Sequence, residues 1–176
     1  MKLLHSLLVL ACLAGCSGSP TSPSETSPLF PELTRASYGV FVGVGPVIEA
    51  RLAEEAAQQL WHIYPAPRHL LNFQQRVAET DGFARPLLEA LQRNGYFVRQ
   101  SHDPVVAPQC SQKPAQHKKK GDGAQYEVVP VCYLIDEVSG LLRLTLYTAG
   151  DTWSRLFVEE QGRLVPSGAW TQKKAP

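Results

Sequence analysis

Residues 47–63 carry the pattern that most constrains the fold of this chain. Apolar side chains recur along this segment every three to four residues, and charged and amide side chains occupy the other side. Pro46 stands where the first turn of a helix tolerates proline, and Pro65 marks the end of the helix. The segment therefore predicts an amphipathic helix. Its apolar side is expected to be core: Ile48, Leu52, Ala56, Leu60 and Ile63.

A second helix is predicted between two short strands. Strand patterns occupy residues 69–74 and 96–100, and apolar side chains between them again follow helical spacing. Pro86 is tolerated only in a first turn, so regular helix is expected to begin near Ala84, and Gly95 is a typical C-terminal cap. Two strands joined through a helix are expected to be parallel neighbours with a right-handed crossover.

The remainder of the chain shows strand patterns only, near residues 128–135, 142–147, 153–158 and 169–172. Pro130 suggests that the first of these is an edge strand or carries a bulge. Three leucines of the second alternate with Arg143, Thr145 and Tyr147, which is typical of a strand with one buried face. The order predicts an α+β fold: two helices packed on one face of a mixed, mostly antiparallel sheet.

The first fifteen residues are interpreted as a signal peptide. Lys2 precedes an apolar run that is too short to span a membrane, and small residues follow it. The sequence LAGC at 13–16 resembles the bacterial lipobox, which implies that Cys16 is lipidated and becomes the first residue of the mature protein. Residue 17 is serine, whereas aspartate at this position is associated with retention at the inner membrane. The serine therefore favours a location on the periplasmic face of the outer membrane. The alternative is an ordinary signal peptide that leaves Cys16 as a free thiol.

Residues 16–36 are rich in serine, threonine and proline, which predicts a disordered linker ahead of a single domain at 37–176. Leu29, Phe30 and Leu33 are unusual in such a linker. They either pack on the following domain or bind a partner together with the glycine-spaced strand or arm that contains Tyr38 and Phe41. Large exposed apolar side chains are unfavourable relative to buried ones, and an extended segment can add to a sheet edge of another protein.

Charge and motif content exclude several classes of function. Removing Lys2 takes the formal charge from +1 to 0, and a neutral chain lacks the basic excess of a nucleic-acid-binding protein. No catalytic Ser-His-Asp order, zinc-ligand spacing or paired-carboxylate motif stands out in the sequence. We therefore expect neither an enzyme nor a metal or cofactor site.

Cys110 and Cys132 are the mature cysteines besides Cys16, and in an oxidising compartment they are expected to form a disulfide. Such a bridge would contribute roughly 3 kcal/mol on the chain-entropy model. The lysine-rich residues 112–123 lie between them and are interpreted as a solvated loop tip. A contact with acidic groups or lipid headgroups is the alternative.

A family resemblance rests on the order of six segments rather than on a single diagnostic motif. Together with the lipobox they resemble the TrbH family of conjugal transfer lipoproteins, from about Ala50 to Trp170. The cysteine pair and the lysine-rich residues fall outside the family pattern. The segments are QLWHIYP at 59–65, LNFQQ at 71–75, LEALQRNGY at 88–96, YLID at 133–136, LRLTL at 142–146 and GRLVPSGAW at 162–170.

The resemblance implies a lipid-anchored structural subunit of a conjugative type IV secretion channel at the outer membrane. Its implied partners are other subunits of the outer-membrane core complex, within a ring-shaped hetero-oligomer, and the membrane itself through Cys16. Direct nucleic-acid binding is not expected. The alternative is a freestanding periplasmic lipoprotein that acts as a binding or mating-exclusion module.

Overall fold

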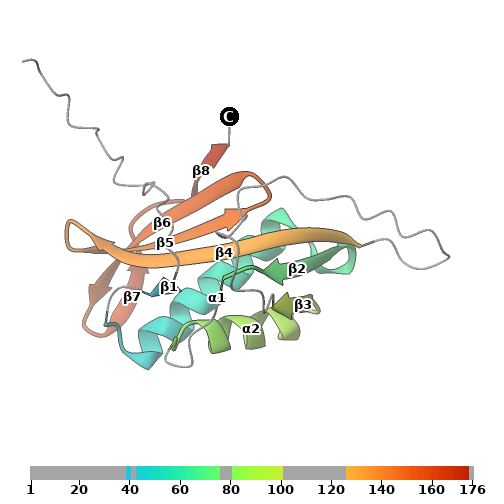
Figure 1. Cartoon of the computed structure of the whole chain (residues 1–176). Helices are drawn as coiled ribbons and strands as arrows, with labels where there is room; N and C mark the ends of the chain where they lie inside the picture. Colours follow the sequence, from blue (N-terminus) through green and yellow to red (C-terminus); the bar gives the residue numbers. More distant parts are fainter. Residues whose placement is uncertain (1–38, 41–42, 76–80, 101–125, 175–176) are drawn as a thin grey trace, which may run out of the picture.

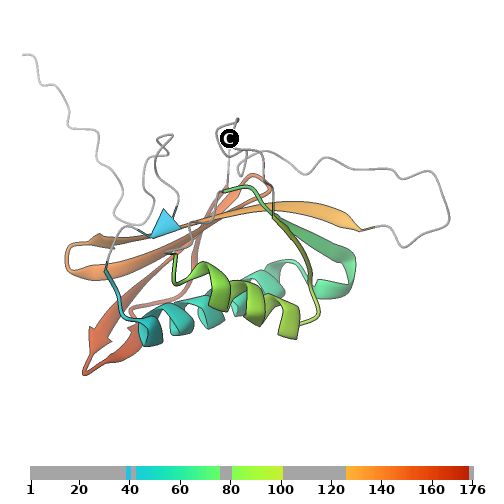
Figure 2. The same ribbon diagram turned by 60° about the horizontal axis from the view of Figure 1, so that its bottom comes forward.

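The computed structural model of the chain describes residues 39–40, 43–75, 81–100 and 126–174. Within these residues, two α-helices cover one face of an eight-stranded mixed sheet, which confirms the predicted α+β class (Figures 1 and 2). In chain order the elements are β1 (Gly39–Val40), α1 (Pro46–Ile63), the short 3-10 helix η1 (Ala66–Arg68), β2 (His69–Phe73), α2 (Ala84–Arg93), β3 (Phe97–Gln100), β4 (Glu127–Val138), β5 (Leu141–Thr148), β6 (Asp151–Glu160), β7 (Arg163–Pro166) and β8 (Thr171–Lys174).

Helix α1 follows its predicted bounds closely. The carbonyl of Gly45 accepts the amides of Ile48 and Glu49 at 2.9 and 3.1 Å, and Pro46, which has no amide hydrogen, occupies the first turn. Four of the five predicted core side chains are buried, and Ile63 is partly exposed. Trp61, near the end of the helix, is 54% exposed.

The sheet has a parallel half and an antiparallel half that meet at β4. The strand order is β3-β2-β4-β5-β6-β7, with β2 parallel to both β3 and β4 as predicted for two strands joined through a helix. Strand β1 also pairs in parallel with β4, farther along the edge that β2 occupies. Strands β7 and β8 share the outer edge of β6 in the same way.

Strand β4 is an interior strand, although Pro130 suggested an edge or a bulge. The carbonyl of Val131 accepts the amide of Gln74 at 3.2 Å, so Val131 faces the β2 side. Backbone groups alternate along a strand, so those of Pro130 face the β5 side. Pairing with β5 begins only at Val131, opposite Thr148. The missing amide of Pro130 therefore falls just past the end of the neighbouring strand, where no ladder bond is needed.

The main core lies between the helices and one face of the sheet. Phe73 of β2, Tyr133 of β4, Leu144 of β5 and Phe157 of β6 are at most 1% exposed and belong to it, together with buried leucines and alanines of both helices. The parallel half contributes alternate residues of β2 and β4, and the antiparallel half contributes Leu142, Leu144 and Leu146 of β5. Both halves of the sheet thus pack on the same helices.

Asp81 joins the start of α2 to the sheet. Its Oδ1 accepts the backbone amides of Phe83 and Ala84 at 3.1 and 3.0 Å, which satisfies donors that the first turn leaves unpaired. Its Oδ2 accepts the hydroxyl of Tyr133, whose backbone amide donates to Gln75 Oε1 at 2.6 Å. One carboxylate therefore caps a helix and fixes the central strand beneath it.

The carboxyl group of Glu49 in α1 lies close to this junction. A Cβ atom on Gly82 would come within 2.0 Å of Glu49 Oε2, so the absence of a side chain at Gly82 permits the approach. Partial burial, and then the negative charge of Asp81, raise the pKa of the Glu49 carboxyl above its ordinary value of 4.5. The ionised carboxylate is less favourable in the folded state than in the unfolded chain, so it lowers stability as the pH rises above about 4.5.

Replacing Glu49 by glutamine should therefore stabilise the protein near neutral pH. We expect Glu49→Gln to raise the urea midpoint at pH 7 by roughly a few tenths of a molar. The difference should disappear near pH 3.5, where the wild-type carboxyl is protonated in both states. Urea titrations at the two pH values measure this. Glu89→Gln, which removes an exposed ion pair with Arg85, is the control and should not stabilise. A lower midpoint for Glu49→Gln at pH 7 would contradict the assignment.

Candidate interaction surfaces

Most residues to which the sequence assigns a function lie outside the described part of the chain. Lipidation and the linker contact therefore remain predictions. The exception is Cys132, which lies in β4 and is fully buried. The residues outside the described part are Cys16, Leu29, Phe30, Leu33, Tyr38, Phe41 and Cys110.

Two residues of the glycine-spaced arm pair with the chain's own sheet. Gly39 lies opposite Leu134 and Val40 opposite Ile135, in parallel with β4. This edge of β4 is free for β1 because pairing with β2 ends at Val131. Gly39 and Val40 thus extend the sheet along the edge of its central strand.

Side chains on the face of the sheet opposite the helices are also buried. Residues paired across a sheet point to the same face, and Cys132 pairs with Tyr147 while Leu134 pairs with Thr145. All four are at most 3% exposed, and three of them form a small apolar cluster separate from the main core. Strand β5 is thus buried on both faces, which corrects the prediction of one buried face. We call Cys132, Leu134, Thr145, Tyr147 and Ser154 the helix-free face.

Polar groups on this side of the sheet satisfy one another. Thr145 Oγ1 and Ser154 Oγ lie 3.2 Å apart across β5 and β6. Arg143 Nε donates to Asp136 Oδ1 at 2.8 Å, and a second bond joins Arg143 Nη2 to Asp136 Oδ2. The Arg143 side chain is 6% exposed, and such a forked pair is the geometry in which a buried guanidinium is tolerated. These pairings make the side suitable for burial beneath another layer.

A second surface, at the amino-terminal ends of β2, β3 and β4, is exposed and aromatic. Phe97 is 58% exposed and Tyr126 37%, and their ring centroids lie 5.4 Å apart although β2 runs between their strands. Leu70 pairs with both Phe97 and Val128, so all three point to the same side of the sheet. We call Leu70, Phe97, Tyr126 and Val128 the aromatic edge. Exposed apolar groups gathered in this way are typical of contact surfaces.

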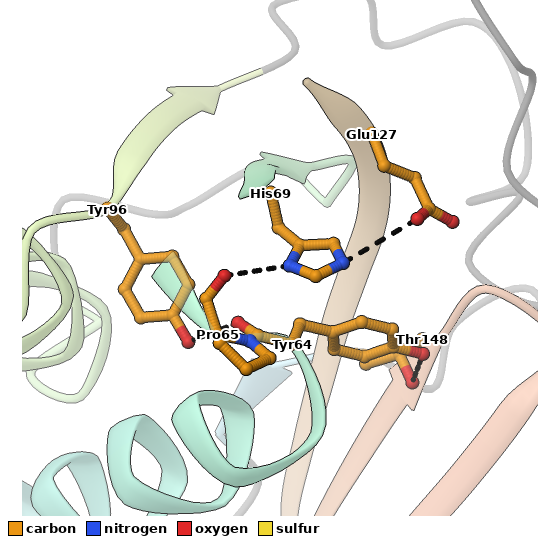
Figure 3. Close-up of polar contacts among 6 residues, drawn as sticks. All are labelled: Tyr64, Pro65, His69, Tyr96, Glu127 and Thr148. Atoms are coloured by element: carbon orange, nitrogen blue, oxygen red, sulfur yellow. Dashed lines mark hydrogen bonds and ion pairs between the residues drawn. The ribbon is translucent and has the colours of Figure 1, made fainter. Parts of the chain in front are cut away.

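A polar cluster beside the aromatic edge fixes the end of α1 to three strands (Figure 3). The Tyr96 hydroxyl donates to the carbonyl of Tyr64 at 2.7 Å, and the Tyr64 hydroxyl donates to Thr148 Oγ1 at 3.2 Å. His69 Nδ1 lies 2.8 Å from the carbonyl oxygen of Pro65, and His69 Nε2 lies 3.6 Å from Glu127 Oε2. The cluster therefore connects the start of β2 to β4 and the turn before β3 to α1.

The chemistry of the cluster suits positioning. Burial raises the pKa of the Tyr64 and Tyr96 hydroxyls, which keeps both protonated as hydrogen-bond donors. His69 uses Nδ1 for the Pro65 carbonyl, so only Nε2 is directed to Glu127. The Tyr64 and His69 rings also meet in a T-shaped arrangement, at a centroid distance of 5.4 Å. Each polar group in the cluster is thus engaged in holding the backbone or a neighbouring ring.

In residues 39–40, 43–75, 81–100 and 126–174, no group of three or more histidine, cysteine, aspartate and glutamate side chains is placed to hold a metal ion. In the same part of the chain, neither helix is long and apolar enough to cross a membrane.

Comparison with known proteins identifies the family. A family model described as conjugal transfer protein TrbH matches residues 36–174, which is most of the chain. Neither a curated protein nor a solved structure matches the chain. The match includes β1, both helices and every strand of the sheet. The chain therefore belongs to the TrbH family of conjugal transfer proteins.

Proposed function

We propose that this protein is a lipid-anchored structural subunit of a conjugative type IV secretion channel at the outer membrane. Family membership gives a role in conjugal transfer, related to type IV secretion and carried out with other transfer proteins. The observation that carries the finer proposal is the position of the family match. It begins at residue 36, directly after the lipobox-like LAGC at 13–16 and the proline-rich linker.

The anchor follows from the chemistry of a lipidated cysteine. Each buried methylene of an acyl chain contributes about 0.8 kcal/mol, so one chain holds a protein weakly and several hold it firmly. Bacterial lipoproteins that this chain resembles carry three acyl chains on the cysteine that corresponds to Cys16. Cleavage before Cys16 removes residues 1–15 and leaves the linker between the membrane and the domain.

Replacing Cys16 by serine should abolish the anchor without affecting the fold. We expect Cys16→Ser to leave the outer-membrane fraction and to be recovered either in the soluble periplasmic fraction or as an uncleaved precursor. Membrane fractionation and mass spectrometry of the amino-terminal peptide measure this. Cys12→Ser, which changes the other cysteine of the signal peptide, is the control and should be processed normally. Cys16→Ser that remains in outer-membrane vesicles would rule out lipid anchoring at this residue.

The linker supplies the first proposed partner contact. Leu29, Phe30 and Leu33 are large apolar side chains in a segment whose composition otherwise suits a tether. A segment that served only as a tether would leave these side chains exposed. Exposure of each one is unfavourable by roughly 1.5–3 kcal/mol relative to burial, so their presence favours a buried contact. We propose that these side chains, together with Tyr38 and Phe41, are buried against another channel subunit. The pairing of Gly39 and Val40 with β4 ties this contact to the domain.

Polar replacement of the linker patch should weaken assembly. We expect the combined change of Leu29, Phe30 and Leu33 to serine to reduce copurification with other transfer proteins and to reduce DNA transfer, because the apolar contact is lost. Copurification in mild detergent and mating assays at matched expression measure this. Val47→Ser, which removes an apolar side chain that is 67% exposed in α1, is the control. Normal transfer by the triple variant would mean that the patch packs on its own domain.

The aromatic edge supplies the second proposed contact, with a neighbouring channel subunit. Phe97 and Tyr126 are the sequence neighbours of Tyr96 and Glu127 in the polar cluster, and both rings are exposed, Phe97 the more so. We expect Phe97→Ser combined with Tyr126→Ser to reduce copurification severalfold while the urea midpoint changes little. Val165→Ser, at an exposed apolar residue on β7, is the matched control. A freestanding binding or exclusion module would copurify with no channel subunit, either as wild type or as the variants.

A further inference from the structure

We propose that two copies of this chain pair through the outer edge of β3, in an antiparallel arrangement centred on Val98. The two sheets would then form one continuous sheet with a two-fold axis through the contact. A second copy of the chain would thus be the partner of the aromatic edge. The inference rests on the proposed function only in taking that edge as a subunit contact, and the pairing itself requires no other transfer protein.

The outer edge of β3 carries backbone groups that β2 does not use. Among the described strands, β3 lies at the end of the sheet and pairs only with β2 (Figure 1). Phe73 of β2 pairs with Val131, but the amide that donates to the Val131 carbonyl is that of the next residue, Gln74. The backbone groups of Phe73 therefore face β3, where they bond to the residues on either side of its partner Gln100. Those of Gln100 and, by alternation, of Val98 therefore point outward.

One antiparallel register suits this edge better than the others. Outward-facing residues of the two strands lie opposite each other, and the amide of Tyr96 is already used by the end of α2. A register centred on Gln100 leaves most of β3 without a partner strand. A register with Val98 opposite Gln100 of the second copy places the two Arg99 side chains opposite each other, which is unfavourable. With Val98 opposite Val98 of the second copy, each Arg99 lies opposite Phe97 instead.

This register brings complementary side chains together. Phe97 and Arg99 are both exposed and, as alternate residues of one strand, point to the same face of the sheet. Directly opposite residues have Cβ atoms about 4.5–5.5 Å apart, so each guanidinium can lie over the Phe97 ring of the other copy. Arg99 Nε donates to Asn72 Oδ1 at 3.1 Å, which holds the guanidinium beside β3. The ring of Tyr126 contacts Phe97 from the β4 side, so the pairing would cover the other side of that ring.

The opposite edge of the sheet is protected against such pairing. It is divided between β7 and β8, which include Pro166, Lys173 and Lys174. Between these two strands, Gly168 has a φ of 129°, and its carbonyl accepts Arg155 Nε at 2.8 Å. Proline, lysine and irregular backbone are devices that prevent edge-to-edge association of sheets. Strand β3, with the sequence FVRQ, contains no proline, glycine or lysine, so it is the edge suited to pairing.

Charge exchange at the two facing positions tests the register. The purified lipoprotein, without other transfer proteins, should sediment as a concentration-dependent dimer in mild detergent with micelles in excess. Phe97→Arg places like charges opposite each other at both sites of the pair and should raise the dimer dissociation constant by roughly tenfold or more. Adding Arg99→Glu makes the facing charges opposite and should restore most of the affinity. Val165→Arg, at an exposed apolar residue of β7, is the control and should have no effect.

Loss of one amide tests the backbone contact. The ladder between β2 and β3 does not use the amide of Val98, and proline is tolerated at such positions of an edge strand. Val98→Pro should therefore abolish the dimer while its urea midpoint stays close to that of Val98→Ala. The alanine variant loses nearly the same side chain but keeps the amide, and it should remain dimeric.

Several results would overturn the pairing. They are a monomeric wild-type protein, tight dimerisation of Phe97→Arg, no recovery when Arg99→Glu is added, and equal dimerisation of Val98→Pro and Val98→Ala. Copurification with other channel proteins is measured separately. A dimer that captures no channel protein would support the pairing and contradict the proposed function. A monomer that captures channel proteins would contradict the pairing and support the proposed function.

Discussion

Pairing along both edges of β4 is the constraint on which the rest of the structure depends. One edge carries β2 and then β1 in parallel, and the other carries β5 antiparallel. The parallel and antiparallel halves of the sheet therefore meet only through this strand. Tyr133, at the middle of β4, is bonded through its backbone to Gln75 and through its hydroxyl to Asp81, the cap of α2. Tyr133 thus connects the central strand of the sheet to the start of helix α2.

Much of the fold could be predicted because local signals agree with the tertiary structure. Prolines at 46 and 65 mark the ends of α1 to within two residues, and α2 begins at Ala84, where Pro86 still falls in the first turn. Long-range register was not predictable. Arg143 and Thr145 are polar residues of the kind expected on an exposed strand face. They are buried instead, because Asp136 and Ser154 on the neighbouring strands pair with them. Strand β7 was missed because its four residues, RLVP, are too few to show alternation.

Of the candidate surfaces, the sequence predicts one, and only the structure reveals the other. The sequence alone singles out the linker patch, because its apolar residues contrast with their neighbours. Nothing local marks Phe97 and Tyr126, which are 29 positions apart in the chain, as a pair. They meet because β2 and β3 are parallel to β4 and in register with it. In the same way, spacing can suggest a disulfide for Cys132, but only the register shows which face of the sheet Cys132 points to.

The parallel pairing of β1 has a mechanical consequence for a tethered domain. In the described part of the chain, a pull on the amino-terminal side acts on Gly39 and Val40, the two described residues of β1. So short a strand separates before the load reaches α1, which starts at Pro46 and is packed into the core along its length. Release of the residues before Pro46 would lengthen the tether by up to roughly 20 Å. Strand β1 can thus yield under tension while β4, the helices and the rest of the sheet keep their pairing.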